Sequence, residues 1–295
     1  MKGSRIHLEL LKVFKDLAEE KNFARVAKRN HLSPGAITQQ IAFLERRFGK
    51  KLVERGKKES VLTEEGKIFL EACCEISRIY EDAVEKIRYP GELSGVVRVA
   101  TIYSIGLYSL SGYIRSFLRS HNRIDLRVEY EGADKVYSGV QEGVYDLGIV
   151  AYPYHHPSID IIPFKEEALT VVCSPDDSLA KMRGVRLRDL RGKSFVAFGT
   201  GIPTRRAIDI LLHKQGIRID IKYECDNIET LKRLVEINAG ISILPENTVI
   251  SEVKNKTLSR IPLLGGSFVR PLGVICKRGR ILPRGAQEFI RWLAR

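Results

Sequence analysis

The feature that most constrains this sequence is a three-residue connection, 30–32, between two short helical patterns. Apolar positions with helical spacing predict the first helix over 23–29. The second is expected to start at Ser33 and Pro34, because serine caps helix N-termini and proline is tolerated at the first helical position. The connection has room only for a tight turn, so this segment is predicted to be a helix-turn-helix.

The second helix of this pair has two different sides. Its predicted core residues recur in steps of four, three and four and are Ile37, Ile41, Leu44 and Phe48. Gly49 is expected to end the helix. The other side carries amide, hydroxyl and guanidinium groups, which suit base edges and phosphates, although a solvated helix face would have the same pattern. The residues predicted here to contact DNA are Ser33, Pro34, Thr38, Gln39 and Arg46.

A helix over 8–18 is predicted before this pair and a β-hairpin after it, with strands 52–55 and 60–62 around a basic tip. Arg55, Lys57 and Lys58 are expected to hold phosphate, because a hairpin beside a DNA groove follows the backbone. Residues 1–60 contain fifteen Lys and Arg against seven Asp and Glu, in a chain of net charge +13. A winged helix-turn-helix that binds double-stranded DNA is therefore predicted.

A long helix is predicted from Thr63, its N-cap, to about residue 89, before Pro90 and Gly91. Its apolar positions step by three and four residues, as in a coiled-coil seam. These predicted dimerisation residues are Phe69, Ala72, Ile76, Ile79 and Ala83. The alternative is that the seam packs against its own domain.

Beyond Gly95 the pattern changes to alternating strands and helices, which predicts an α/β body with a parallel sheet. The expected strands are 96–100, 126–130, 146–150, 169–173, 195–198, 219–224 and 272–276. The expected helices are 104–119, 135–142, 203–215, 228–238 and 287–293. Two α/β lobes with a cleft between them are the economical packing of this set.

Several of these segments resemble the LysR-type transcriptional regulators. Residues 22–27 (Asn-Phe-Ala-Arg-Val-Ala) and 32–41 (Leu-Ser-Pro-Gly-Ala-Ile-Thr-Gln-Gln-Ile) are similar to the family's helix-turn-helix. Residues 62–66 continue that pattern, and residues 146–150 and 238–245 resemble two motifs of the family's body. Gly35 stands where the family has a larger residue, and Asn238 replaces a glycine. Asparagine tolerates a left-handed conformation, so the turn at Asn238 is expected to persist.

The resemblance implies an N-terminal winged helix-turn-helix, a linker helix and a two-lobed effector domain of the periplasmic-binding-protein type. The expected domains are 1–62, 63–90 and 91–295, with lobe I at about 95–165 and 268–295 and lobe II at about 166–267. It also implies a homodimer or homotetramer, no cofactor, and RNA polymerase as a partner if the protein is an activator.

The family's effector lies between the lobes, where strands end and helices begin. The residues expected to line this site are Thr101, Tyr103, Ser104, Tyr130, Ala151, Tyr152, Thr200, Gly201, Thr204 and Asn227. Helix capping is the alternative role for the hydroxyl groups among them. Because these turns are rich in hydroxyls and the body is rich in Lys and Arg, a small anion or carboxylate is expected as the effector.

Other features restrict the remaining function classes. No apolar segment is long enough to span a membrane or to act as a secretion signal, so a cytoplasmic protein is expected. No nucleophile elbow, phosphate-binding loop or metal set is present, which disfavours an enzyme built on the α/β body. His155 and His156 could form a metal or protonation site, but a loop near the lobe crossover is the simpler interpretation. A redox-sensing regulator is a further alternative, since five scattered cysteines are present.

Overall fold

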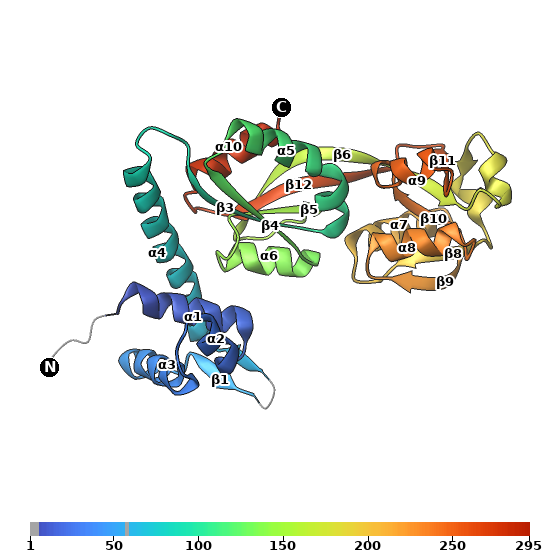
Figure 1. Cartoon of the computed structure of the whole chain (residues 1–295). Helices are drawn as coiled ribbons and strands as arrows, with labels where there is room; N and C mark the ends of the chain where they lie inside the picture. The colour runs from blue at the N-terminus through green and yellow to red at the C-terminus, as the bar shows by residue number, and fades with distance from the viewer. Residues whose placement is uncertain (1–5, 57–58) are drawn as a thin grey trace. The chain divides into compact units, whose positions relative to one another are not determined.

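The computed structural model describes residues 6–56 and 59–295 and divides into two compact units. The first comprises residues 1–95 with 141–144, and the second comprises residues 96–140 with 145–295. Among the described residues, no helix is long and apolar enough to cross a membrane. Figure 1 colours both units by residue number.

The first unit is a three-helix bundle with a two-stranded hairpin and one long helix. Its elements are α1 (Leu8–Glu20), α2 (Phe23–Arg29), α3 (Pro34–Phe48), β1 (Val53–Arg55), β2 (Ser60–Leu62) and α4 (Glu64–Arg88). The strands pair antiparallel from Val53 opposite Leu62 to Arg55 opposite Ser60. The predicted helix-turn-helix and hairpin are therefore confirmed.

Local capping explains where the helices of this unit begin and end. The Ser33 hydroxyl accepts a hydrogen bond from the Ala36 amide at 3.1 Å, and Thr63 accepts one from Gly66 at 3.0 Å. Gly49 follows α3 in the left-handed conformation with φ 65°, which costs glycine little. One core prediction is wrong: Phe48 is 44% exposed, because it lies on the last turn of α3, where its ring meets Phe69 at 5.0 Å.

Lobe I of the second unit is a sheet with helices on both faces. Its own elements are β3 (Gly95–Thr101), η1 (Ile105–Ser109), α5 (Ser111–Ser120), β4 (Ile124–Tyr130), α6 (Ala133–Gln141), β5 (Leu147–Ala151) and α10 (Arg284–Leu293). Figure 1 shows α5 and α10 on one face and α6 on the other. The element η1 is a π-helix, whereas the sequence pattern predicts one continuous helix over this region.

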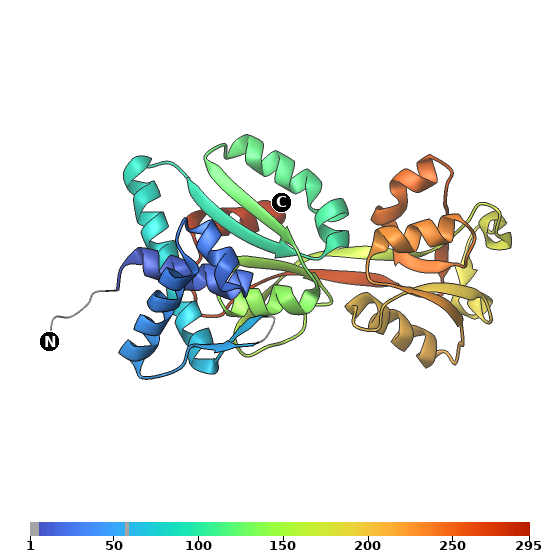
Figure 2. The ribbon, with the colours of Figure 1, turned by 60° about the horizontal axis from the view of Figure 1, so that its bottom comes forward.

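Two long strands belong to both lobes, β6 (Ile159–Cys173) and β12 (Val269–Lys277), as Figure 2 shows from a second direction. They pair antiparallel from Val269 opposite Ala168 to Lys277 opposite Ile159. The strand order is β4-β3-β5-β12-β6-β11-β7, in which β11 is Ser259–Leu264 and β7 is Val185–Arg186. The parallel pairing predicted from the strand–helix alternation is confirmed for β3 and β5. The sheet as a whole is mixed, because β12 returns from lobe II and inserts antiparallel between β5 and β6.

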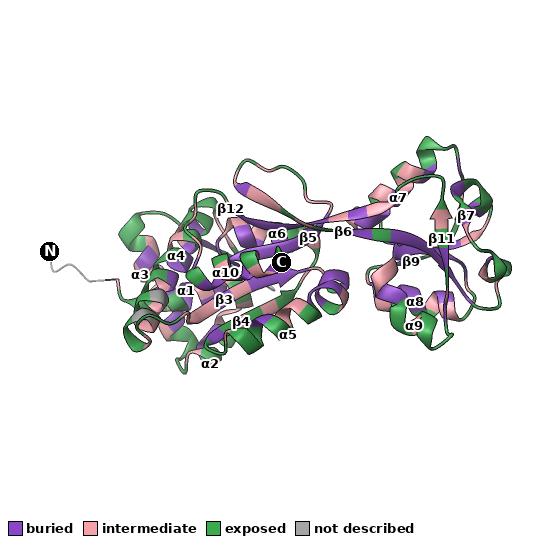
Figure 3. Cartoon of the chain, turned by 90° about the horizontal axis from the view of Figure 1, so that it is seen from above, coloured by how far each residue is buried: buried purple, intermediate pink, exposed green. Residues whose placement is uncertain are grey.

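Lobe II is built around the second half of β6. Its elements are η2 (Ser178–Lys181), β7 (Val185–Arg186), η3 (Leu187–Leu190), β8 (Ser194–Phe198), α7 (Pro203–Lys214), β9 (Asp220–Cys225), α8 (Ile228–Glu236), β10 (Ser242–Pro245), η4 (Glu246–Val249), α9 (Ile250–Lys254) and β11 (Ser259–Leu264). Strands β10 and β11 pair with β6 on its two sides, and β8 pairs parallel with β9. Buried residues follow β5, β12 and the second half of β6 in Figure 3.

The turn before β10 has the backbone that its sequence predicts. Asn238 adopts φ 62° and Gly240 adopts φ 157°. A Cβ on Gly240 would lie 2.8 Å from the backbone oxygen of Ser194, so the close approach of two chain segments requires glycine there. The left-handed residue expected at Asn238 is confirmed.

Candidate nucleic-acid interface and effector site

The outer side of α3 offers the polar groups expected of a recognition helix. Gln39 and Arg46 are exposed and Thr38 is half-buried, while Ile37, Ile41 and Leu44 are buried beneath them. Ser33 and Pro34 are exposed at the start of the helix. The sequence thus places an amide, a hydroxyl and a guanidinium on one solvent-facing side of a helix whose other side is fixed by the core.

The α3 helix and the hairpin are held together by Glu45. Its carboxylate accepts hydrogen bonds from the Leu52 amide at 3.1 Å and the Val53 amide at 3.3 Å, and it pairs with Lys51 at 2.9 Å. Burial alone would raise the pKa of Glu45, but these three donors outweigh it and lower the pKa below 4.5. Glu45 therefore fixes the start of the hairpin relative to α3.

The hairpin is the element in which cations were predicted to contact phosphate. Arg55 lies at the end of β1, where it is opposite Ser60. Lys57 and Lys58 lie outside the described residues.

The turn of the helix-turn-helix is held to α1 by Asp16. The buried Asp16 carboxylate accepts a hydrogen bond from Asn30 at 2.6 Å and pairs with Arg29 at 3.3 Å.

The predicted seam of α4 divides into two parts. Phe69 packs within its own unit, where its ring lies 4.9 Å from that of Phe14. Ile76 and Ile79 are 44% and 56% exposed, and Ala83 is also exposed. Three further apolar side chains of α4 are exposed, Ile68, Tyr80 and Ile87. The C-terminal half of α4 therefore presents apolar surface that a folded protein rarely leaves uncovered.

In lobe I, the predicted effector residues of the first turn separate into buried and exposed groups. The Thr101 hydroxyl is buried and donates to the Ile149 carbonyl at 3.0 Å. The buried Ser104 hydroxyl accepts a hydrogen bond from Arg270 at 3.0 Å and makes no N-cap hydrogen bond to η1. Tyr103 is 52% exposed and its ring lies 5.6 Å from that of Tyr130. The exposed aromatic pair is the part of this turn that can meet a ligand directly.

The next two residues expected at the site lie at the end of β5. Ala151 is buried opposite Leu272 of β12. Tyr152 adopts φ 50°, a strained conformation for a residue with a side chain, and its amide donates to the Pro271 carbonyl at 2.8 Å. The bend at Tyr152 leads the chain out of the sheet beside the strands that cross between the lobes.

In lobe II, the predicted residues lie at two helix starts. Thr200 and Gly201 are exposed just before α7, whereas Thr204 is buried in its first turn. The N-cap residue of α7 is Ile202, which makes no side-chain capping bond. Asn227 caps α8 by accepting from the Thr230 amide at 2.9 Å, so its side chain has the capping role.

A buried ion pair on the two shared strands was not predicted from the sequence. Arg270 of β12 is 1% exposed and donates to Glu167 of β6 through Nε at 2.9 Å and through Nη2. Ser109 also donates to Glu167, and the Asn247 amide donates to the same carboxylate at 3.0 Å. The available signal was a charged residue close to each apolar strand, at 167 before 169–173 and at 270 before 272–276.

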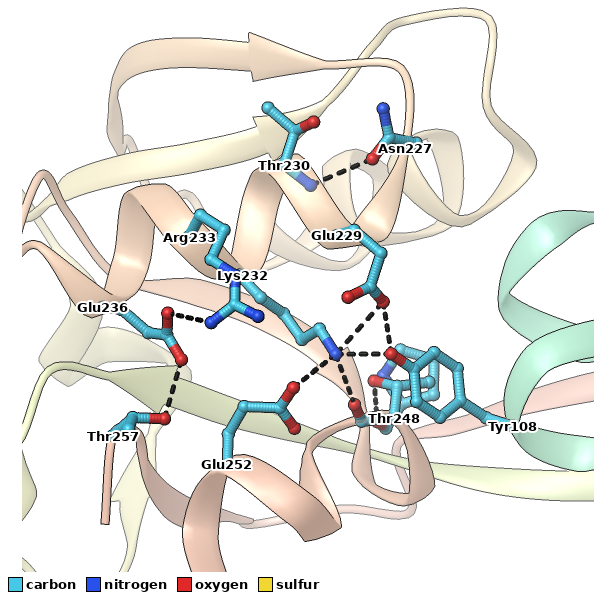
Figure 4. Close-up of polar contacts among 11 residues, drawn as sticks. Tyr108, Asn227, Glu229, Thr230, Lys232, Arg233, Glu236, Thr248, Glu252 and Thr257 are labelled. Atoms are coloured by element: carbon cyan, nitrogen blue, oxygen red, sulfur yellow. Dashed lines mark hydrogen bonds and ion pairs between the residues drawn. The ribbon is translucent and has the colours of Figure 1, made fainter. Parts of the chain in front are cut away.

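A second unpredicted cluster surrounds Lys232 of α8, which is 1% exposed (Figure 4). Its ammonium lies 2.6 Å from Glu252, 3.1 Å from Glu229 and 3.2 Å from the Thr248 carbonyl. It also donates to the Tyr108 hydroxyl of lobe I at 2.5 Å. Burial alone would lower the pKa of Lys232, but these oxygen partners outweigh it and raise the pKa, so the ammonium keeps its charge.

Around the histidine loop, as elsewhere in the part of the chain that is described, no group of three or more metal-ligating side chains occurs. His155 is exposed, and His156 contacts the Ser158 hydroxyl through Nδ1 at 2.9 Å. Tyr154 of the same loop stacks on Tyr137 at 4.1 Å. These contacts favour the interpretation as a connecting loop.

All five cysteines are buried, which bears on the redox alternative. Burial raises the pKa of Cys73 and of Cys173 to about 12, and it also raises the pKa of Cys225 and Cys276. Because the thiolate is the reactive form, buried thiols with raised pKa values react slowly with oxidants. The thiol environment therefore disfavours redox sensing.

A helix-turn-helix unit followed by a two-lobed α/β unit defines a class of protein, the DNA-binding transcription regulators that carry their own ligand-binding domain. The chain belongs to the LysR family of these regulators. Residues 8–67 match the family model of the bacterial regulatory helix-turn-helix protein, lysR family, and residues 90–295 match that of the LysR substrate binding domain. It is accordingly a DNA-binding regulator with an effector-binding domain, and the alternative of an enzyme is set aside.

Curated relatives match along nearly the whole chain. The RuBisCO operon transcriptional regulator of Allochromatium vinosum is 26% identical over 287 residues, covering 96% of this chain and 94% of that protein. The uncharacterised HTH-type regulator YbhD of Escherichia coli strain K12 is 27% identical over 287 residues, covering 97% of this chain and 90% of that protein.

Solved structures show the same fold. A full-length variant of OxyR from Pseudomonas aeruginosa has a TM-score of 0.76 at 20% identity, covering 99% of this chain and 94% of that one. The effector-binding domain of QuiR in complex with shikimate has a TM-score of 0.63 at 21% identity, over 68% of this chain and 96% of that one. The Synechocystis PCC6803 CcmR regulatory domain in complex with 2-PG has a TM-score of 0.62 at 22% identity, over 68% and 95%.

Proposed function

We propose that the exposed side of α3 reads base edges in the major groove and that the hairpin cations hold the DNA backbone. The observation that supports this most directly is the exposed Gln39 on a helix capped by Ser33 and anchored by buried Ile37 and Ile41. Thr38 would contact bases with Gln39, while Arg46, Arg55, Lys57 and Lys58 would contact phosphates. Ser33 and Pro34 would set the distance between the helix start and the backbone.

DNA binding is tested by electrophoretic retardation of DNA from upstream of the chain's own coding sequence. Gln39→Ala should weaken specific binding about fivefold to 150-fold, because a good bidentate base contact is worth ~1–3 kcal/mol. Gln215→Ala, which changes an exposed glutamine of lobe II, is the matched control and should have no effect. Affinity should also fall steeply with salt, and a slope near zero would contradict phosphate binding by the basic residues.

We also infer that the effector is a small anion or carboxylate held between the lobes. Tyr103, Tyr130, Thr200 and Gly201 are exposed where strands end, and would contact it directly. The other members of the proposed site would shape it from behind or beside these contacts, and they are Thr101, Ser104, Ala151, Tyr152, Thr204 and Asn227. Shikimate bound to the QuiR domain is a carboxylate, which supports this chemical class on a similar fold.

The effector proposal is tested by native mass spectrometry of the purified chain and by thermal shift with shikimate and short-chain carboxylates. A bound acid should raise the melting temperature, and Tyr103→Ala or Thr200→Ala should remove the increase. Tyr223→Ala, at an exposed tyrosine of β9, should retain it. If no carboxylate changes the melting temperature and the co-purified ligand is neutral or cationic, the proposed class is wrong.

The exposed half of α4 is proposed to be a dimer interface through Ile76, Ile79 and Ala83, with Ala72 and Phe69 at its N-terminal end. Their step of three and four residues is that of a two-stranded seam. Sedimentation equilibrium should show a dimer or tetramer that dissociates on Ile79→Asp, but not on Ile281→Asp at an exposed site of the second unit. If the protein acts as an activator, RNA polymerase is its further partner.

A further inference from the structure

One short segment of lobe I, residues 104–109, makes side-chain bonds to both shared strands and to lobe II. Ser104 accepts from Arg270, Tyr108 bonds to Glu229 and Lys232, and Ser109 bonds to Glu167. The segment contains η1, a π-helix, in which the Leu110 amide donates to the Ile105 carbonyl at 2.9 Å. π-helical turns are rare and are frequent at functional sites.

Tyr108 is the member of this segment that contacts lobe II through both its hydroxyl and its ring. The hydroxyl donates to Glu229 and accepts from Lys232, and the ring lies 4.6 Å from the Lys232 ammonium (Figure 4). The same side chain packs against the core cluster of lobe II that includes Val172 and Leu231. One tyrosine thus makes both a polar and an apolar contact across the two lobes.

Lobe II does not need this tyrosine to satisfy its buried lysine. An ammonium has three N–H donors: Glu252 and the Thr248 carbonyl accept hydrogen bonds from it, and Glu229, which is already ion-paired with it at 3.1 Å, is the acceptor for the third donor once Tyr108 leaves. Withdrawal of Tyr108 therefore leaves no buried charge without a partner. The contact is one that can open and close, in contrast to a buried ion pair that would be left unpaired.

The same segment also contacts the aromatic pair of the proposed effector site, through Gly106 and the Tyr130 ring. Gly106 of η1 has no side chain, and a Cβ there would overlap the Tyr130 ring and lie 2.9 Å from the Thr101 side chain. The Tyr130 ring therefore rests on the π-helical backbone, next to Tyr103. A ligand that displaces this ring presses on the same short helix that carries Tyr108.

We propose that η1 couples the effector site to the arrangement of the lobes, and that Tyr108 is a positioning residue which ties lobe I to lobe II through Glu229 and Lys232. Conversion of the π-turn to α-helical hydrogen bonding would rotate Tyr108 and the residues that follow it relative to those before the turn by up to about 100°, the angle of one α-helical residue. Tyr108 would then leave lobe II. The coupling rests on the proposed effector site, whereas the tie itself does not.

The tie is tested on the full-length chain without DNA or effector, by measuring the distance between spin labels on the two lobes. Arg119→Cys in α5 and Lys214→Cys in α7 provide exposed attachment sites, while the native cysteines are buried. Labelled chain is diluted with unlabelled chain so that each assembly carries one labelled copy. Tyr108→Phe should shift or broaden the distance distribution, with an increase of about tenfold in the population of separated lobes, as expected for loss of hydrogen bonds to charged groups.

Tyr113→Phe is the matched control, because Tyr113 of the same lobe packs against Phe164 and its hydroxyl makes no side-chain tie to lobe II among the described residues. Glu229→Gln is a second variant that removes the charge which Tyr108 contacts, and it should produce a smaller change of the same kind. If Tyr108→Phe and Glu229→Gln both give the distribution of the Tyr113→Phe chain, the tie does not exist.

The coupling has its own test in Gly106→Ala, which forces the Tyr130 ring away from η1. This variant should change the same distance distribution. An unchanged distribution in Gly106→Ala, together with a changed one in Tyr108→Phe, would overturn the coupling and retain the tie. Because no effector is added, failure of the carboxylate proposal would leave these outcomes unaffected.

Discussion

The buried ion pair between Arg270 and Glu167 should contribute far more to stability than the ion pairs at the surface. The perturbation is Arg270→Met, which keeps much of the length and apolar volume of the side chain and removes its charge. Arg270 is 1% exposed and Glu167 is 4% exposed, so the variant leaves a carboxylate that is inaccessible to water without its counter-charge. Removing one partner of a buried pair costs ~3–5 kcal/mol.

The hydrogen bonds of Glu167 refine this magnitude. The carboxylate also accepts from Ser109 and from Asn247, and these two donors remain in the Arg270→Met protein. We therefore expect a loss near the lower limit, ~3 kcal/mol in the free energy of unfolding. The double variant Arg270→Met with Glu167→Met should recover ~1–2 kcal/mol of it, because no buried charge is left.

The assay is equilibrium unfolding in urea followed by tryptophan fluorescence. Trp292 is the single tryptophan of the chain and packs on Phe117 in lobe I, so the signal reports the second unit specifically. Arg278→Met is the control, since its ion pair with Asp160 at 2.7 Å is about half exposed on both sides and should be worth ~1 kcal/mol or less. The reasoning is refuted if Arg270→Met costs no more than Arg278→Met, or if the double variant is less stable than the single one.

Three other features of the structure are open to direct measurement. Glu45→Gln should destabilise the first unit at neutral pH, measured by the amide exchange of residues 34–55. Because folding lowers the pKa of Glu45, the difference in stability between the variant and the parent chain should vanish as the pH falls below 4.5. Gly66→Ala should lower the melting temperature of the same unit, since the new Cβ would overlap the Leu52 carbonyl oxygen. The control Gly112→Ala has open space around its Cβ in α5 and should be neutral or stabilising by ~0.5 kcal/mol in the same melting measurement. At about pH 7.5, a thiol reagent should label none of the buried cysteines of the native chain within minutes and should label all five after unfolding. Rapid labelling of Cys73 or Cys173 in the native chain would restore the redox alternative.

The first unit could be predicted from the sequence because its signals are local. The cap at Ser33, the proline at 34 and the glycine at 49 act within one turn of the residues that they affect. The prediction that Phe48 is a core residue is wrong because helical spacing shows which face of a helix a residue lies on, but not how far along the helix the core extends. Its exposure of 44% depends on how the helices of the unit cover the last turn of α3.

The second unit could be predicted only in part, because its central pairing is not local. The first half of β6, from 159 to 167, has an apolar pattern in 159–164 that Pro163 interrupts and that Lys165 and Glu166 end. Its extended conformation is fixed by pairing with β12, about a hundred residues away along the chain. The same pairing buries Glu167 and Arg270, so the charges that organise the centre of the unit could not be recognised before their partners were known.

The position of β12 in the sheet determines the order in which the two units can fold during synthesis. The helices and hairpin of the first unit come almost entirely from residues 1–95 and can pack while the ribosome is still translating the body. Lobe I cannot close its sheet until β12 emerges and inserts between β5 and β6, and α10 then covers it. A nascent or truncated chain would therefore carry a folded helix-turn-helix unit before, or without, a completed effector-binding body.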